Sequence, residues 1–204
     1  GPTDHHRLKI IESQLDRLAD SVRNLLSFSK QAKPPLKPLD VNQVLEELIH
    51  LSKPWFHTRN VKLLSSLSPD LPPILGDSTY LQTLFLNLIT NALDAMPHGG
   101  SLTIQTRGIA PPASSYDGTW LEISIADTGT GIPEETRKKI FDPFFTTKRM
   151  EEGTGLGLSI CEKIVKDLSG RLEVKSELGK GSTLSLRSKE KNGTKISPSL
   201  DCGR

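Results

Sequence analysis

Cysteine is scarce in this 204-residue sequence, which contains only Cys161 and Cys202, far apart in the chain. A disulfide framework and a cysteine zinc site are therefore not supported. No run approaches 18 apolar residues, and the first 30 residues lack the apolar core of a signal peptide, so neither a membrane span nor secretion is expected of this segment. Charge of one sign is also lacking: 26 basic residues face 24 acidic ones, and the net charge of +2 predicts no nucleic-acid partner.

Glycine, by contrast, is abundant, with 16 residues, many of which stand in short clusters between Gly99 and Gly181. The 35% hydrophobic and 25% charged residues are the composition of one ordinary domain, or of one domain with an appendage. The glycine clusters are the first pointer to where this domain binds a ligand.

The N-terminal segment, residues 1–32, is predicted to be a helix with a heptad seam that requires a partner helix. The apolar positions of this seam are Leu8, Ile11, Leu15, Leu18, Val22 and Leu25. An amphipathic helix packed on its own domain is the alternative interpretation. Three prolines within residues 33–39 end the helix and predict a linker.

The remainder predicts an α+β domain over residues 40–188, built as a two-layer α/β sandwich with helices on one face of a run of antiparallel strands. Helical spacing predicts helices over 41–56, 81–96 and 156–168 and a short one over 134–140, with Asp40 and either Asp77 or Ser78 as N-caps. Strands are predicted over 61–67, 102–106, 120–126, 172–176 and 182–187. Residues 189–204 are predicted to be a flexible tail.

A polar stripe interrupts the apolar helix predicted over 81–96. Asn87, Asn91 and Asp94 lie at i, i+4 and i+7 and therefore share one face. An amide oxygen is a neutral hard ligand, suited to Mg²⁺ that takes most of its ligands from phosphates. The alternative is a stripe that simply faces solvent.

An acidic residue followed by glycines stands at the end of the strand predicted over 120–126. In the run from Asp127 to Pro133, Gly129 and Gly131 allow a flat ring to approach the backbone, and the carboxylate can accept from an exocyclic amine. A turn that begins with Asp127 is the structural alternative.

Three alternating glycines, Gly153, Gly155 and Gly157, precede the helix predicted over 156–168. Unobstructed backbone N–H groups at a helix N-terminus suit phosphate. The spacing is not that of a dinucleotide fingerprint, and Gly179-Lys180 lacks the following Ser or Thr of a phosphate-binding Walker loop. The segment from Phe141 to Lys148, three aromatics beside a lysine, could close over a nucleotide or could merely anchor a surface loop.

These four motifs, in this order, resemble the catalytic, ATP-binding domain of the sensor histidine kinases of two-component systems, within the superfamily of gyrase B, chaperone and mismatch-repair ATPases. The stripe resembles the N box, residues 127–131 the G1 box, 141–148 the F box, 153–158 the G2 box and 179–183 the last glycine box. The sequences of residues 141–148 and 153–158 are similar to the nitrogen-regulation subgroup of these kinases. The resemblance implies a Bergerat-type ATP-binding fold, with one long helix of a dimerisation hairpin before it.

The resemblance also implies the roles of individual residues. Asp127 would accept from the adenine amino group, with Thr183 nearby and Gly131 leaving room for the ring. Asn91 would bind Mg²⁺, with Asn87 supporting it, and Lys148 would reach the terminal phosphate. The full implied ATP-binding set is Asn87, Asn91, Asp94, Asp127, Gly129, Gly131, Ile132, Phe144, Thr147, Lys148, Gly153, Thr154, Gly155, Leu156, Gly157, Leu158 and Thr183.

Asn87, Asn91 and Lys148 are the expected catalytic residues, in a protein that transfers the γ-phosphoryl group of ATP to a histidine. The hydrolases of the superfamily carry a glutamate in place of Asn87, and an amide cannot act as a general base, so slow ATP hydrolysis is expected. Asp94 replaces the lysine or arginine of many relatives, which places that phosphate contact in question.

Residues 1–32 resemble the second helix of the dimerisation and histidine-phosphotransfer hairpin, without the first helix and its phosphoacceptor. Autophosphorylation of this chain alone is therefore not expected. The implied partners are ATP, the histidine-bearing helix of its own kinase, a response regulator receiver domain and a second copy in a homodimer, in the cytoplasm. A serine kinase of the same fold and a non-catalytic interaction module are the alternative functions.

Overall fold

The computed structural model describes residues 36–110, 120–148 and 153–189. The heptad helix predicted within residues 1–32 and most of the predicted tail lie outside the described residues. The last residues of the predicted linker are described, and they form a short strand, β1 (Lys37–Leu39), that pairs antiparallel with β3 (Ile74–Gly76).

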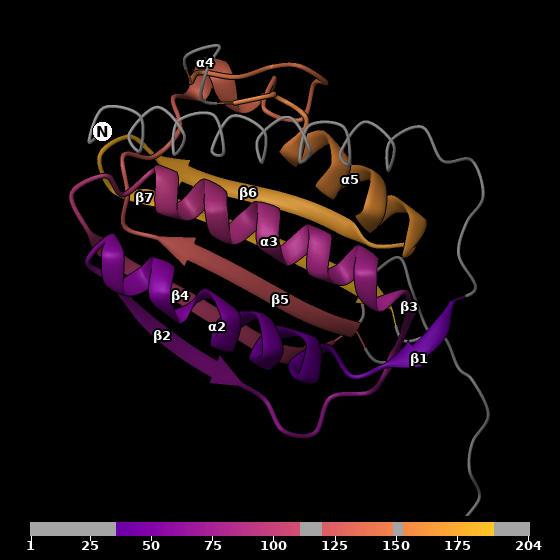
Figure 1. The fold of residues 1–204 in the computed structure, drawn as a ribbon. Coiled ribbons are helices and arrows are strands. Elements are labelled where there is room, and N and C mark those ends of the chain that lie inside the picture. Colours follow the sequence, from indigo (N-terminus) through magenta and orange to yellow (C-terminus); the bar gives the residue numbers. More distant parts are fainter. Residues whose placement is uncertain (1–35, 111–119, 149–152, 190–204) are drawn as a thin grey trace, which may run out of the picture.

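The described chain folds into two layers, as predicted (Figure 1). The helix layer contains α2 (Val41–Thr58), α3 (Ser78–Asp94) and α5 (Gly157–Asp167), and it covers one face of the sheet. The sheet is formed by β2 (Val61–Leu67), β4 (Gly100–Ile109), β5 (Trp120–Asp127), β6 (Arg171–Glu177) and β7 (Gly181–Lys189). The short helix α4 (Glu134–Arg137) lies beyond one end of the sheet.

The strand order is β2-β4-β5-β7-β6, and one pairing differs from the prediction. The pairs β4–β5, β5–β7 and β7–β6 are antiparallel. The pair β2–β4 is parallel. The sheet is therefore mixed. Parallel neighbours need a long crossover connection, and here residues 68–99, with α3, supply it.

Helix α3 is the centre of the core. Its residues Leu81, Leu84, Phe85 and Ile89 are fully buried between the flanking helices and the sheet. Alternate residues of the strands meet them from the other side, namely Leu102, Ile104, Leu121, Ile123 and Ile125. Burial of this continuous apolar layer is what fixes the position of the polar stripe on α3.

Side chains cap both long helices at the predicted positions. Asp40 accepts from the backbone N–H of Asn42 at 2.8 Å, and Asp77 accepts from that of Tyr80 at 3.1 Å. Asp77 rather than Ser78 is thus the cap of α3, which begins three residues before the predicted Leu81 and ends at Asp94. Within the described residues no helix is long and apolar enough to span a bilayer.

Candidate functional site

The loop after β5 is bonded to the end of α3, so two of the predicted motifs meet at one edge of the sheet. The Thr130 N–H donates to the Ala95 carbonyl at 3.0 Å. A Cβ added at Gly129 would lie 2.4 Å from the same carbonyl oxygen, so only glycine permits this approach. The contact places Asp127 at the same end of the fold as Asn91 and Asp94.

The turn between β6 and β7 packs on the other side of this loop. The Gly179 N–H donates to the Thr130 carbonyl at 2.8 Å. Gly131 has φ +70°, and a Cβ there would stand 2.1 Å from the carbonyl oxygen of Glu177. Gly131 was expected to leave room for the adenine ring. The structure gives a further reason for glycine at this position, because the loop packs closely against the turn between β6 and β7.

The Asp127 carboxylate is buried at the end of β5. Its Oδ1 accepts from the backbone N–H groups of Gly129 at 2.8 Å and Ser182 at 3.3 Å. Burial raises the pKa of Asp127, and the N–H donors oppose this rise without cancelling it. A second carboxylate oxygen remains as an acceptor, which is the property that an exocyclic amine requires.

Thr183 lies on the opposite face of the sheet from Asp127, contrary to the expectation that it would be nearby. In the antiparallel β5–β7 pair, Asp127 stands opposite Ser182, and Thr183 stands opposite Ala126. Because strand residues alternate between faces, the hydroxyl on the helix side is that of Ser182, which is buried. Its Oγ lies 2.9 Å from that of Ser176.

Ser176 and Ser182 are residues that sequence reasoning missed. The Ser176 hydroxyl accepts from the Ile132 N–H at 2.7 Å and so fastens β6 to the loop after Asp127. The alternation of Ser182 with the apolar Leu184 and Leu186 was a signal that could have placed Ser182 on the inner face. The same alternation, with Leu172 and Val174, marks Ser176 as an inner-face residue, but its contact with Ile132 spans 44 residues and follows from no local pattern.

The asparagines of α3 lie beside the N-terminus of α5. Asn87 and Asn91 are both half-buried. A Cβ at Gly157, the first residue of α5, would be 3.2 Å from Asn87 Oδ1 and 3.9 Å from Asn91 Nδ2. Asn87 and Asn91 therefore lie beside a helix start, which is an arrangement that favours anions, whereas Asp94, the third residue of the stripe, is exposed.

The loop before α5 packs backbone against backbone on the aromatic segment. Gly155 has φ +66°, and a Cβ there would lie 2.4 Å from the carbonyl carbon of Phe144. The Thr154 hydroxyl accepts from the Leu156 N–H at 3.3 Å, and the Leu156 side chain enters the core. Leu158 is half-buried. The loop thus offers its backbone, and not the Leu156 side chain, to a ligand.

Two of the expected ATP-binding residues in the aromatic segment, Phe144 and Thr147, have exposed side chains. Phe144 is 69% exposed and has φ +66°, a left-handed conformation that is rare for a bulky residue. Thr147 is exposed as well. A Cβ at Gly153 would lie 3.0 Å from Thr146 Oγ1 and 3.3 Å from Lys148 Cδ, so a glycine at this position leaves room for the lysine side chain.

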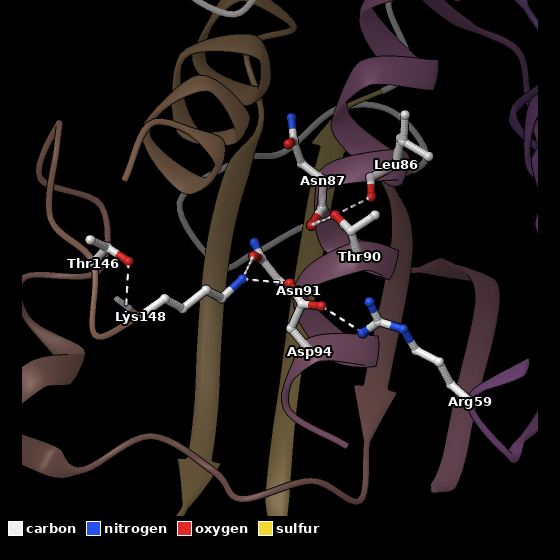
Figure 2. A network of polar contacts seen from close by, with 8 residues as sticks. All are labelled: Arg59, Leu86, Asn87, Thr90, Asn91, Asp94, Thr146 and Lys148. Carbon is white, nitrogen blue, oxygen red and sulfur yellow. Dashed lines mark hydrogen bonds and ion pairs between the residues drawn. The ribbon is translucent and has the colours of Figure 1, made fainter. Parts of the chain in front are cut away.

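Lys148 is drawn into the site by Asp94, whose carboxylate binds two cations (Figure 2). Lys148 Nζ lies 2.6 Å from Asp94 Oδ2 and 3.4 Å from Asn91 Oδ1, and Arg59 Nη1 lies 2.6 Å from Asp94 Oδ1. Burial alone would raise the pKa of Asp94, but the hydrogen bonds from Lys148 and Arg59 outweigh it and lower this pKa. Arg59 is a further residue that the motifs did not indicate.

The contact of Lys148 Nζ with Asn91 Oδ1 indicates whether this part of the site can accept a cation. The amide oxygen faces a positive charge, as a magnesium ligand must. The described residues contain no group of three or more His, Cys, Asp or Glu side chains arranged to hold a metal. A metal at Asn91 would therefore take its other ligands from phosphates and water, and the donor set fits Mg²⁺ on those terms.

Comparison with known proteins assigns a family to this geometry. The family described as "Histidine kinase-, DNA gyrase B-, and HSP90-like ATPase" matches residues 76–192. Sensor kinase CckA of Brucella abortus is 37% identical over 86% of this chain and 19% of its own length. The sensory histidine kinase/phosphatase NtrB of Azospirillum brasilense is 34% identical over 86% of this chain and 45% of its own length. The chain thus spans less than half of either relative.

Solved structures show the same fold. ShkA in complex with AMPPNP superimposes with a TM-score of 0.71 and 28% identity over 85% of this chain and 36% of that one. ThkA in complex with the response regulator TrrA gives a TM-score of 0.70 and 26% identity over 89% of this chain and 50% of that one.

Proposed function

This chain belongs to the histidine kinase-, DNA gyrase B- and HSP90-like ATPase family, and we propose that it is the ATP-binding catalytic part of a sensor histidine kinase. In this proposal it transfers the γ-phosphoryl group of ATP to a histidine on a separate helix, and a response regulator receives the group next. The observation that carries the proposal is the meeting of Asp127, the α3 asparagines, Lys148 and the start of α5 at one edge of the sheet.

The base end of the site is assigned to Asp127. The Gly129 and Ser182 N–H groups hold its Oδ1, so its other oxygen keeps a fixed direction and accepts from the adenine amino group. Guanine presents a carbonyl oxygen where adenine has this amine, and that oxygen would meet a carboxylate. The proposed site therefore selects adenine over guanine.

The phosphate end is assigned to the backbone N–H groups from Gly155 to Leu158 at the start of α5, with Lys148 as the side-chain cation. The Leu156 N–H already donates to the Thr154 hydroxyl, so the N–H groups of the first turn of α5, together with the helix dipole, are what attract phosphate without a basic surface. The chain carries a formal net charge of only +2, so a basic surface is not available to bind phosphate. Binding through backbone N–H groups is consistent with that charge.

Magnesium is assigned to Asn91, with Asn87 one helical turn earlier. When bound, the ion would neutralise charge on the phosphates during transfer. Asn87 donates or accepts hydrogen bonds but cannot remove a proton from water. The chain's own residues therefore hold ATP and orient its terminal phosphate without activating a hydrolytic water, and turnover of ATP by this chain is expected below about 1 s⁻¹.

The partners and location are part of the proposal. The relatives are sensor kinases, one neighbour is a complex with a response regulator, and another holds AMPPNP. We infer for the whole protein a histidine-bearing helix of its own, a response regulator receiver domain, a homodimer and a cytoplasmic location of this domain. The heptad seam predicted within residues 1–32 supports the dimer.

The decisive experiment is a calorimetric titration of the chain with Mg·ATP beside Asp127→Ala, with Asp70→Ala, an exposed residue after β2 at the other end of the sheet, as a control. The proposal expects wild type and the control to bind alike and Asp127→Ala to bind at least about tenfold more weakly. Equal affinity of all three proteins would contradict it. Addition of a separate histidine-bearing hairpin should then yield acid-labile phosphate, whereas acid-stable phosphoserine would point to a serine kinase instead.

A further inference from the structure

Asp94 is a negative charge in an unfavourable position, and two cations compensate for it. It is the last residue of α3, where the helix dipole disfavours an anion. Arg59 reaches it from the end of α2, and Lys148 reaches it from the aromatic segment, both at 2.6 Å (Figure 2). Together the three side chains carry a net charge of +1.

Lys148 cannot remain where it is when a metal binds Asn91. Its Nζ is 3.4 Å from Asn91 Oδ1, the oxygen assigned to magnesium. If that oxygen held an ion, the ammonium and the ion would repel one another at close range. This step rests on the proposed function: Mg·ATP has to displace Lys148 from Asn91, and the terminal phosphate is the new partner within its reach.

Departure of Lys148 would leave Asp94 as an uncompensated carboxylate beside incoming phosphates. Arg59 prevents this, because it holds the other oxygen of Asp94 and is itself fixed at the helix end by its backbone N–H, which donates to Trp55 at 3.1 Å. We propose that Arg59 is a positioning residue for ATP: it neutralises Asp94, so that Lys148 can exchange Asp94 for the terminal phosphate.

The three side chains are partly exposed. This agrees better with an ion pair in which Lys148 can change its partner than with one that stabilises the fold. Arg59 is 47% exposed, and Asp94 and Lys148 are each 33% exposed. Ion pairs in such surroundings contribute little to folding stability. Their effect should therefore appear in nucleotide binding while the melting temperature changes little.

The test is a double-mutant cycle on the full chain, with Mg·ATP affinity measured by calorimetry. Arg59→Met should weaken Mg·ATP binding by about five- to tenfold, and Arg59→Lys should restore most of it. Asp94→Asn should bind as tightly as wild type or more tightly. In the Asp94→Asn background, Arg59→Met should have no further effect, because no charge remains for Arg59 to neutralise.

Two controls separate this role from the alternatives. Lys166→Met removes one positive charge from the far end of α5 and should leave affinity unchanged. Mg·ADP lacks the terminal phosphate, so its affinity should fall less in Arg59→Met than that of Mg·ATP. Thermal melting shows that each variant is folded, and Arg59→Gln takes the place of Arg59→Met if the latter is not.

Three results would overturn the inference. Unchanged Mg·ATP affinity in Arg59→Met would remove the role of Arg59 altogether. Equal weakening with and without Asp94 would mean that Arg59 contacts phosphate directly or acts through the fold. If wild type itself does not bind Mg·ATP, the proposed function fails and the inference with it, whereas binding by wild type with an unaffected Arg59→Met overturns the inference alone.

Discussion

Ser182 and Asp127 stand opposite each other in the β5–β7 pair, and the Ser182 N–H donates to the Asp127 carboxylate at 3.3 Å. The last glycine box therefore presents its first hydroxyl residue, not its second, to the proposed base site. The Ser182 hydroxyl in turn lies 2.9 Å from that of Ser176. The proposed adenine end of the site is thus a small network of serines around one buried carboxylate.

Exchange of the two neighbouring hydroxyl residues tests this geometry. Ser182→Ala should weaken Mg·ATP binding by about two- to tenfold, because one buried hydrogen-bonding group beside Asp127 is lost. Thr183→Ala should change the affinity by less than about twofold, because its side chain faces away from the helices. Calorimetry of both variants decides the matter, and the reverse order of effects would contradict the assignment.

Asp127→Asn should separate binding from stability. Since burial raises the pKa of Asp127, protonation favours the folded state, and that contribution is present at low pH and is lost as pH rises through the folded pKa. At neutral pH the wild type therefore keeps a buried negative charge that destabilises the fold. The Asn side chain carries no charge, and its amide oxygen can still accept from the Gly129 and Ser182 N–H groups. The melting temperature at pH 7 should be equal or higher in the variant.

The same Asp127→Asn variant should bind Mg·ATP at least about tenfold more weakly, because the new amide N–H₂ would face the adenine amine, donor against donor. Differential scanning fluorimetry and calorimetry on one preparation measure both effects. A clearly lower melting temperature together with unchanged affinity would contradict the assigned role of the carboxylate.

The sequence predicted those parts of the fold that depend on local pattern. The strands over 102–106 and 120–126 and the cap at Asp40 were found because alternation and capping depend on neighbouring residues. The parallel pairing of β2 with β4 was not found, because it depends on how the chain crosses over through α3. Pairing of β1 with β3 was missed for the same reason, since prolines near both strands suggested only turns.

The candidate site divides in the same way. Asn91, Asp127 and Lys148 stand in contiguous motifs and could be named from the sequence. Arg59 could not, because its partner Asp94 is 35 residues away and no motif joins them. The sequence also could not show that the side chain of Thr183 lies on the other face of the sheet from that of Asp127, because a motif gives the order of residues but not the face of the strand on which each one lies.

Glu122 makes the stability of the fold depend on pH. Only 6% of its side chain is exposed, and it accepts from Arg107 at 2.6 Å and Arg187 at 2.9 Å across β4, β5 and β7. Burial alone would raise the pKa of Glu122, but the hydrogen bonds from Arg187 and Arg107 outweigh it and lower this pKa from its ordinary 4.5. Its contribution to stability is therefore complete above about pH 4.5 and is lost as pH falls through the folded pKa.

Glu122→Gln should lower the free energy of unfolding at pH 7 by about 1–3 kcal/mol, less than for a fully buried pair, because both arginines are partly exposed to solvent. The difference from wild type should shrink as the pH is lowered below 4. Urea unfolding at several pH values measures it. Glu134→Gln, which breaks an exposed pair with Arg137, serves as the control and should cost less than about 0.5 kcal/mol.

Phe144 combines large exposure with a left-handed backbone, and glycine at this position should relieve the strain. An L side chain in this conformation costs roughly 1 kcal/mol, so Phe144→Gly should be more stable than Phe144→Ala by about that amount, although glycine also loses more entropy on folding. The comparison of Gly with Ala removes the ring in both variants and isolates the backbone. Urea unfolding provides the measurement, and a less stable glycine variant would show that the positive φ of residue 144 is not strained. Because Gly155 packs on the backbone of Phe144, both variants should keep the loop in place, and their Mg·ATP affinities should agree with each other within about threefold.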